Sequence, residues 1–140
     1  LSSWIESALL VMSPLFKTEK ITVKNTITFD RWLSIDLQQM EQVLINLLTN
    51  SMYALQNSIS KEIIISAEVK EKRIFITITD HGLGVEKEIE DKIFLPFFTT
   101  RKEGAGIGLT LSKSIVEAHG GYLVYQKSDA TTRFMICLIE

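Results

Sequence analysis

Three stretches of the chain space their apolar residues three and four positions apart, and this spacing predicts helices. The first helix is predicted over 5–16, the second runs for about twenty residues after Asp36, and the third covers 108–119. Asp36 stands directly before the second pattern, where an N-cap residue belongs, and Gly120-Gly121 provides a stop for the third. The second helix has one broad apolar face, which we expect to pack against the rest of the fold.

Apolar and polar residues alternate between these helices, and a period of two predicts β-strands. The predicted strands are a run over 21–29 interrupted near Asn25, a short one over 32–35, a hairpin of 63–69 with 74–79, and a final hairpin of 122–126 with 133–139. This order of elements indicates an α+β fold. We expect a two-layer α/β sandwich, in which about three helices cover one face of a mixed, mainly antiparallel sheet.

Residues 85–107 form the one long stretch with weak periodicity, and they hold Pro96, Gly104 and Gly106. The pattern predicts a long loop with at most one short helix, around 86–91. Loops longer than about fifteen residues are unusual within a compact domain and are often functional, so the chemistry is expected near this segment.

Composition narrows the class of protein. The chain has 140 residues, 46 % of them apolar, and a formal net charge of −2, which fits one domain with its own core and no nucleic-acid partner. No apolar run approaches the roughly twenty residues that a membrane span needs. The chain begins at Leu1 with neither an initiator Met nor a signal-peptide pattern, so we expect a fragment of a longer parent. Cys137 is the only cysteine, and its alternating apolar surroundings predict a buried strand residue.

Two amides stand out on the second predicted helix. Asn46 and Asn50 are four residues apart, so they project from the same side, at the edge of the apolar face. Asn is a poor helix former, so two of them carry a local cost. They are either a polar helix edge that meets solvent or amide oxygens aimed at a hard cation such as Mg²⁺.

A carboxylate stands at the predicted end of a strand, where Asp80 is followed by Gly82 and Gly84. Glycines allow the backbone to approach a ligand closely. A carboxylate accepts hydrogen bonds, so it would select a ligand with an NH₂ group, which adenine has at C6 and guanine lacks there. The alternative is a simple tight turn.

Glycines also open the third predicted helix, at Gly104, Gly106 and Gly108. Backbone N–H groups at a helix N-terminus attract anions, and the helix dipole adds to the attraction. The motif follows no strand at dinucleotide-fold spacing, and it lacks the Lys-Ser/Thr that ends a P-loop. The preceding segment, 94–102, combines aromatic residues with hydroxyls and cations. It would form either a lid whose Arg101 or Lys102 meets a phosphate or a hydrophobic loop with a solvated basic end.

Together and in this order, the four segments resemble the N, G1, F and G2 boxes of histidine-kinase catalytic domains in the Bergerat, or GHKL, superfamily. The boxes correspond to 42–51, 80–85, 93–100 and 104–109, the last followed by 115–121. The resemblance spans nearly the whole chain and implies a single ATP-binding catalytic domain over 1–140 with the Bergerat fold. It also implies an ATP lid over about 92–107, and a dimerisation and histidine phosphotransfer domain that lies outside the chain.

The resemblance implies a role for each motif. Asn50 would be the Mg²⁺ ligand, with Asn46 assisting at the metal or the phosphates, and Asp80 would hold the adenine amino group. Asn46, Asn50 and Arg101 would be the catalytic residues. The remaining ATP-binding residues would be Gly82, Gly84, Thr100, Arg101, Lys102, Gly104, Gly106, Ile107, Gly108 and Leu109.

Three positions depart from the family pattern. His81 stands where Asn is usual, and we expect it to be a turn residue that points away from the pocket. Tyr53 occupies a position that often holds a Lys for phosphate contact, so that charge must come from elsewhere or be absent. Thr99-Thr100-Arg101 replaces the more usual Thr-Thr-Lys, which keeps the charge but changes its geometry.

The implied reaction is transfer of the ATP γ-phosphoryl group to a histidine on the dimerisation domain, for relay to a response regulator receiver domain. Neither His81 nor His119 suits the acceptor role, because one lies in a binding loop and the other ends a helix. The parent would be a homodimer that can be anchored in the inner membrane, and this domain would be cytoplasmic and monomeric by itself. One alternative is an ATP-hydrolysing clamp like gyrase or MutL, although those relatives carry Glu at the position of Asn46. The other is a module that binds partners but no nucleotide.

Overall fold

The computed structural model describes residues 1–55, 58–82, 93–94, 108–127 and 131–139. The elements follow the predicted order of helices and strands. They are α1 (Ser2–Thr18), β1 (Thr22–Asn25), α2 (Leu37–Ala54), β2 (Glu62–Lys70), β3 (Arg73–Asp80), α3 (Gly108–Ala118), β4 (Tyr122–Lys127) and β5 (Thr132–Ile139).

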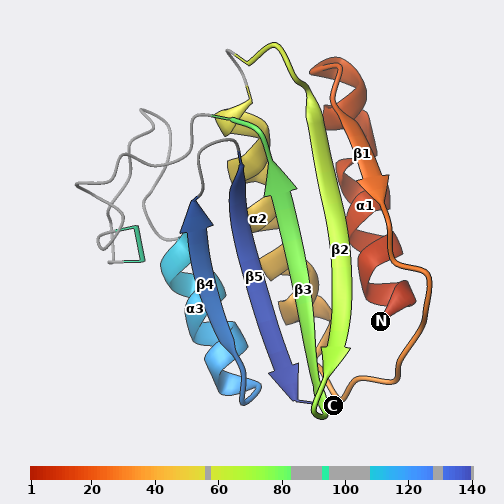
Figure 1. Ribbon diagram of the computed structural model, residues 1–140, viewed down its shortest axis with the longest axis vertical. Helices are drawn as coiled ribbons and strands as arrows, with labels where there is room; N and C mark the ends of the chain where they lie inside the picture. The colour runs from red at the N-terminus through yellow and green to blue at the C-terminus, as the bar shows by residue number, and fades with distance from the viewer. Residues whose placement is uncertain (56–57, 83–92, 95–107, 128–130, 140) are drawn as a thin grey trace.

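The strands form one sheet in the order β1-β2-β3-β5-β4. β1 runs parallel to β2, and the other neighbours are antiparallel, so the sheet is mixed and mainly antiparallel. All three helices lie on the same face of this sheet, behind it in the view of Figure 1. The predicted two-layer α/β sandwich is confirmed.

The strand predicted over 32–35 is wrong, because no strand forms there. Leu33 and Ile35 pack against the core while Trp32 is 97 % exposed. The alternation therefore records which side chains touch the core, without a neighbouring strand to complete a ladder. The first strand is also shorter than predicted. It ends at Asn25, whose side-chain oxygen accepts a hydrogen bond from the Ile27 N–H at 3.0 Å in a local turn.

The first hairpin turns within two residues, a tighter turn than the sequence pattern predicts. Lys70 pairs with Arg73, and Glu71 and Lys72 between them have φ values of 52° and 65°. Two successive residues with positive φ are the hallmark of the two-residue turn that matches the twist of antiparallel strands. The short helix predicted around 86–91 and most of the predicted lid lie outside the described residues.

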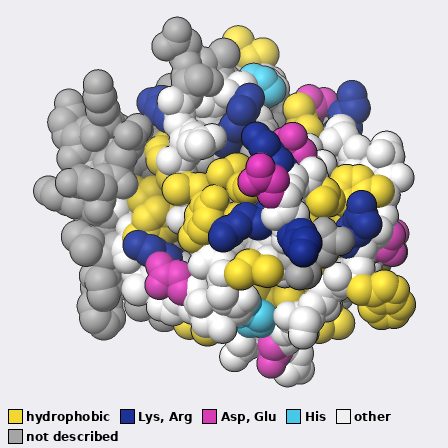
Figure 2. Space-filling model, turned by 60° about the horizontal axis from the view of Figure 1, so that its bottom comes forward, with side chains coloured by type: hydrophobic (Ala, Val, Ile, Leu, Met, Phe, Trp, Pro, Cys, Tyr) yellow, Lys and Arg dark blue, Asp and Glu magenta, His cyan; other side chains and the backbone are white. Residues whose placement is uncertain are grey.

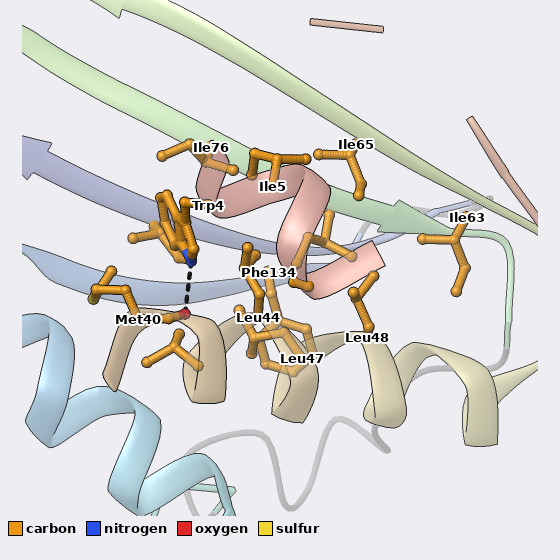
Figure 3. Close-up of a cluster of buried hydrophobic side chains, with 14 of the residues drawn as sticks. Trp4, Ile5, Met40, Leu44, Leu47, Leu48, Ile63, Ile65, Ile76 and Phe134 are labelled. Carbon is orange, nitrogen blue, oxygen red and sulfur yellow. Dashed lines mark hydrogen bonds between the residues drawn. The ribbon is translucent and has the colours of Figure 1, made fainter. Parts of the chain in front are cut away.

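The core lies between the sheet and the helices (Figure 3). Trp4 of α1 is 1 % exposed, and its indole N–H donates to the Met40 carbonyl of α2 at 2.7 Å. β3 supplies three fully buried isoleucines to this core, Ile74, Ile76 and Ile78. The bond to Met40 satisfies the indole N–H of Trp4, as the burial of an indole requires.

Both predicted caps form. The Asp36 side chain accepts a hydrogen bond from the Gln39 N–H at 3.0 Å, and Gly120 has a φ of 80° after α3. His119 joins the two ends, because its Nε2 accepts from the Asp36 N–H at 3.0 Å and its Nδ1 lies 2.7 Å from the Ile115 carbonyl. These partners require a neutral ring with its hydrogen on Nδ1, so His119 has a structural role.

The surface is mixed in character. Figure 2 shows lysines and arginines interspersed with acidic and apolar side chains over the face turned forward. Within the described ranges, none of the helices is both long and apolar enough to span a bilayer. Cys137 is buried, as predicted, and the Arg73 guanidinium lies 3.8 Å from its sulfur.

Candidate functional site

A line of amides runs along one side of α2 and meets the start of α3. The Asn46 side-chain nitrogen donates to the Gly108 carbonyl at 3.3 Å and to the Ser112 hydroxyl at 3.2 Å. Its oxygen accepts from the Gln42 side chain at 3.0 Å. Because the Gly108 carbonyl can only accept, the amide must turn its nitrogen toward α3 and its oxygen toward Gln42. Asn46 therefore links α2 to the first turn of α3.

Asn50 has a different set of contacts. Its side-chain nitrogen donates to the Asn46 backbone carbonyl at 2.8 Å. Among the described residues its side-chain oxygen has no hydrogen-bond donor. A half-buried amide oxygen without a donor is suited to a hard cation. The described part of the chain contains no cluster of three or more His, Cys, Asp or Glu side chains that could bind a metal without such help.

Asp80 is the last residue of β3 and is 1 % exposed. Burial raises the pKa of its carboxyl above the ordinary value, and the effect outweighs the hydrogen bond that the Gly82 N–H donates at 2.8 Å. The nearby Ser51 hydroxyl also lowers this pKa, although the pair does not reach the distance and angle of an ordinary hydrogen bond. A buried carboxylate with so few donors is costly unless a ligand supplies more.

Two buried hydroxyls near this carboxylate were not predicted from the sequence. Ser51 Oγ and Thr132 Oγ1 are buried and lack hydrogen-bond partners in the described part of the chain. Thr132 lies directly opposite Asp80 in the β3–β5 register, on the side of β5 that faces the core. The hydroxyls and the carboxylate come from α2, β5 and β3. Buried polar groups normally find partners, so this convergence indicates a pocket floor for a polar ligand.

The sequence held a signal for one of these hydroxyls. β5 sends Phe134, Ile136 and Leu138 into the core at alternating positions, and Thr132 continues that series as a polar residue at an inward position. Ser51 had no comparable signal, because a serine inside a helix is ordinary.

Gly82 has a packing reason of its own. A Cβ at this position would lie 2.5 Å from the carbonyl oxygen of Ala54, in the last turn of α2. Only glycine allows so close an approach, which brings the end of β3 against the end of α2. The same contact places Asp80 next to the part of α2 that carries Asn50 and Ser51.

The other predicted site residues fall into two groups. Gly108 opens α3 and Leu109 packs against the core, while His81 is exposed, as expected for a turn residue. Tyr53 is 38 % exposed. The remainder lie outside the described residues, namely Gly84, Thr100, Arg101, Lys102, Gly104, Gly106 and Ile107.

A buried carboxylate at a strand end, two helix amides four residues apart and the helix that Gly108 opens beside them suit a polar ligand with an anionic part, as a nucleotide has. The model of the histidine kinase-, DNA gyrase B-, and HSP90-like ATPases matches residues 35–139, and the chain belongs to this family. The membership predicted from the four motifs is thereby confirmed.

Two of the curated relatives that match are sensor proteins. The chain is 41 % identical over 98 residues to sensor protein TdiS of Thauera aromatica, a match that covers 64 % of this chain and 17 % of that protein. It is 35 % identical over 100 residues to the C4-dicarboxylate transport sensor protein DctB of Rhizobium meliloti, which covers 71 % and 16 %. The chain thus spans less than a fifth of the length of either relative.

Solved structures agree on the fold. The catalytic domain of histidine kinase ThkA superposes with a TM-score of 0.86 at 24 % identity, covering 99 % of this chain and 91 % of that one. The Acinetobacter baumannii histidine kinase AdeS gives 0.81 at 25 % identity, covering 99 % and 64 %. The fold is that of histidine kinase catalytic domains, so the predicted Bergerat fold is confirmed.

Proposed function

We propose that this chain is the ATP-binding catalytic domain of a sensor histidine kinase. Its substrates are ATP and a histidine on a separate dimerisation domain of the same protein. The observation that carries the proposal is the difference between the two amides of α2: the Asn46 nitrogen is bonded to α3, whereas the Asn50 side-chain oxygen has no donor among the described residues. Membership of an ATPase family and similarity to sensor kinases support it.

The adenine end of the nucleotide is assigned to the buried polar floor. Asp80 accepts from the C6 amino group of adenine, and guanine is rejected because its carbonyl there would face a carboxylate. The Ser51 and Thr132 hydroxyls, which have no hydrogen-bond partner among the described residues, lie near that carboxylate and supply further contacts to the ligand, directly or through water. Gly82 keeps the backbone close behind them.

The phosphate end is assigned to the amides of α2 and the first turn of α3. Asn50 offers a side-chain oxygen that has no donor among the described residues and is suited to Mg²⁺ bound jointly with phosphate oxygens and water. The cation would neutralise charge on the phosphates during transfer. Backbone N–H groups at the start of α3 face anions with the positive end of the helix dipole. Arg101 and Lys102, outside the described residues, are proposed to offset the remaining charge.

The reaction requires positioning more than proton transfer. A neutral imidazole nitrogen attacks the γ-phosphorus, the bond from that phosphorus to the β,γ-bridging oxygen breaks, and ADP leaves. The imidazole then loses its proton to solvent. No carboxylate base is needed, and Asn46, bonded to Gly108 and Ser112, provides none.

An ATP-hydrolysing clamp is the main rival. It needs a base to activate water, and the related clamps have Glu where this chain has Asn46. The Asn46 nitrogen is committed to α3 and its oxygen carries no negative charge, so water activation has no base at this position.

Two measurements on the chain separate the alternatives. Calorimetric titration with ATP in the presence of Mg²⁺ should show binding that weakens when Mg²⁺ is replaced by a chelator, and again in an Asn50→Ala variant. Steady phosphate release should be close to the uncatalysed rate. No ATP binding by the unmodified chain would reject both enzymes, whereas hydrolysis abolished by Asn46→Ala would favour the clamp.

The partners follow from the same proposal. The phosphorylated histidine would pass its phosphoryl group to an aspartate on a response regulator. Histidine kinase ThkA has been solved in complex with response regulator protein TrrA, which supports a partner of this class. The parent is proposed to be a homodimer whose membrane segments, where present, lie outside this cytoplasmic domain.

A further inference from the structure

Four polar side chains of α2 become more exposed from the end of the helix toward its start. Ser51 is 1 % exposed, Asn50 and Asn46 are half-buried, and Gln42 is exposed. At 1.5 Å per residue, Gln42 lies about 13 Å along the helix axis from Ser51. That separation is comparable to the length of an extended nucleoside triphosphate. With adenine beside Ser51 and the triphosphate extended along α2, the terminal phosphoryl group would reach the level of Gln42.

Gln42 has an oriented and partly unused amide. Its nitrogen donates to the Asn46 oxygen at 3.0 Å, and the Asn46 amide is itself fixed by the Gly108 carbonyl. The Gln42 NH₂ group has a second N–H, for which the described residues provide no acceptor. A donor that is already oriented loses less entropy when it binds an anion than a free side chain does.

We propose that Gln42 donates this second N–H to the terminal phosphoryl group of ATP and thereby distinguishes a nucleoside triphosphate from a diphosphate. The inference rests on the proposed function, because it requires adenine to lie at the Asp80 end. A hydrogen bond to a charged oxygen is stronger than one between neutral groups, so an exposed glutamine can still contribute measurably.

The experiment compares ATP and ADP affinities by calorimetric titration of this 140-residue chain with Mg²⁺ present. The variants are Gln42→Ala and Gln42→Glu. The matched control is Gln38→Ala, one helical turn earlier, exposed and without a bond to Asn46. Ala is at least as good a helix former as Gln, so all three proteins should fold, which circular dichroism can check.

Gln42→Ala should weaken ATP binding by about three- to tenfold and leave ADP binding unchanged. Gln42→Glu should weaken ATP binding further, by at least about tenfold, because it puts a carboxylate beside the phosphates. Gln38→Ala should change neither affinity.

Three results would overturn the inference. Equal weakening of ATP and ADP would mean that Gln42 acts only by positioning Asn46. Unchanged affinity for both nucleotides would mean that the side chain makes no contact. An unmodified chain that binds neither nucleotide would reject the proposed function itself, which distinguishes that failure from the first two.

Discussion

The middle of β3 and its C-terminal end handle buried groups in opposite ways. Along the strand, Ile76 lies in the core beside Trp4, whose indole N–H is bonded to the Met40 carbonyl. At its end, Asp80 is equally buried, yet its pKa is raised, and the hydroxyls of Ser51 and Thr132 beside it lack partners among the described residues. Apolar packing around the middle of the strand stabilises the fold. The buried polar groups at its C-terminal end reduce stability until a ligand binds them.

The largest effect on stability is expected in the core. Trp4→Ala should lower the free energy of unfolding by about 3–5 kcal/mol, since it leaves a cavity and removes the partner of the Met40 carbonyl. Urea unfolding measures this loss. The chain contains its own control, because Trp32 is 97 % exposed and Trp32→Ala should change stability by less than about 0.5 kcal/mol. Equal losses in the two variants would contradict the placement of the core.

At Asp80, a substitution should weaken ATP binding without lowering the free energy of unfolding. Asp80→Asn should weaken ATP binding by about 1.5–3 kcal/mol, the range for hydrogen bonds to charged groups. It should leave the free energy of unfolding at neutral pH unchanged or raise it, because the buried charge is lost. Titration calorimetry and urea unfolding measure the two quantities. Asp36→Asn is the control, since Asn caps a helix as well as Asp does, and it should alter neither.

The pH dependence of stability tests whether the buried charge of Asp80 destabilises the fold. Burial raises the pKa of Asp80 in the folded state, so its ionised form is disfavoured there and reduces stability at neutral pH. The wild-type protein should regain this stability as pH falls through the raised pKa toward the ordinary carboxyl value. The stability difference from Asp80→Asn should therefore shrink over that window, and a difference that grows on acidification would contradict the assignment.

Two buried serines offer the smallest and most closely matched comparison. Ser51 Oγ has no hydrogen-bond partner in the part of the chain that the structure describes, while Ser112 accepts from the Asn46 side chain at 3.2 Å, and both are at most 1 % exposed. Ser51→Ala should raise the free energy of unfolding by up to about 1 kcal/mol, and Ser112→Ala should lower it by about 0.5–1.5 kcal/mol. Opposite signs in urea unfolding support the account, whereas two losses of equal size would mean that the Ser51 hydroxyl is satisfied.

Sequence patterns predicted most of the fold because its elements carry two agreeing signals. α2 combines an N-cap at Asp36 with helical periodicity, and the strands of both hairpins alternate on either side of a short segment that contains charged residues. The prediction over 32–35 failed because alternation shows contact with the core, while a strand also needs a partner.

The candidate site was predicted where residue type is unusual for its place. Asn46 and Asn50 are poor helix formers inside a helix, and Asp80 ends a buried strand. Ser51 was missed because a helical serine is common, and its significance depends on Asp80 of β3, which lies beside it from later in the chain. The bonds of Asn46 to Gly108 and Ser112 also join distant parts of the sequence, so no local pattern could reveal that it links two helices.

The most direct test of the central claim is a phosphoryl-transfer assay. The chain is mixed with ATP labelled at the γ-phosphate and with the histidine-bearing dimerisation segment of its parent protein. The account predicts acid-labile label on that segment, none on the chain itself, and loss of transfer in the Asn50→Ala variant. Label that appears only as free phosphate, at a rate that depends on Asn46, would contradict it.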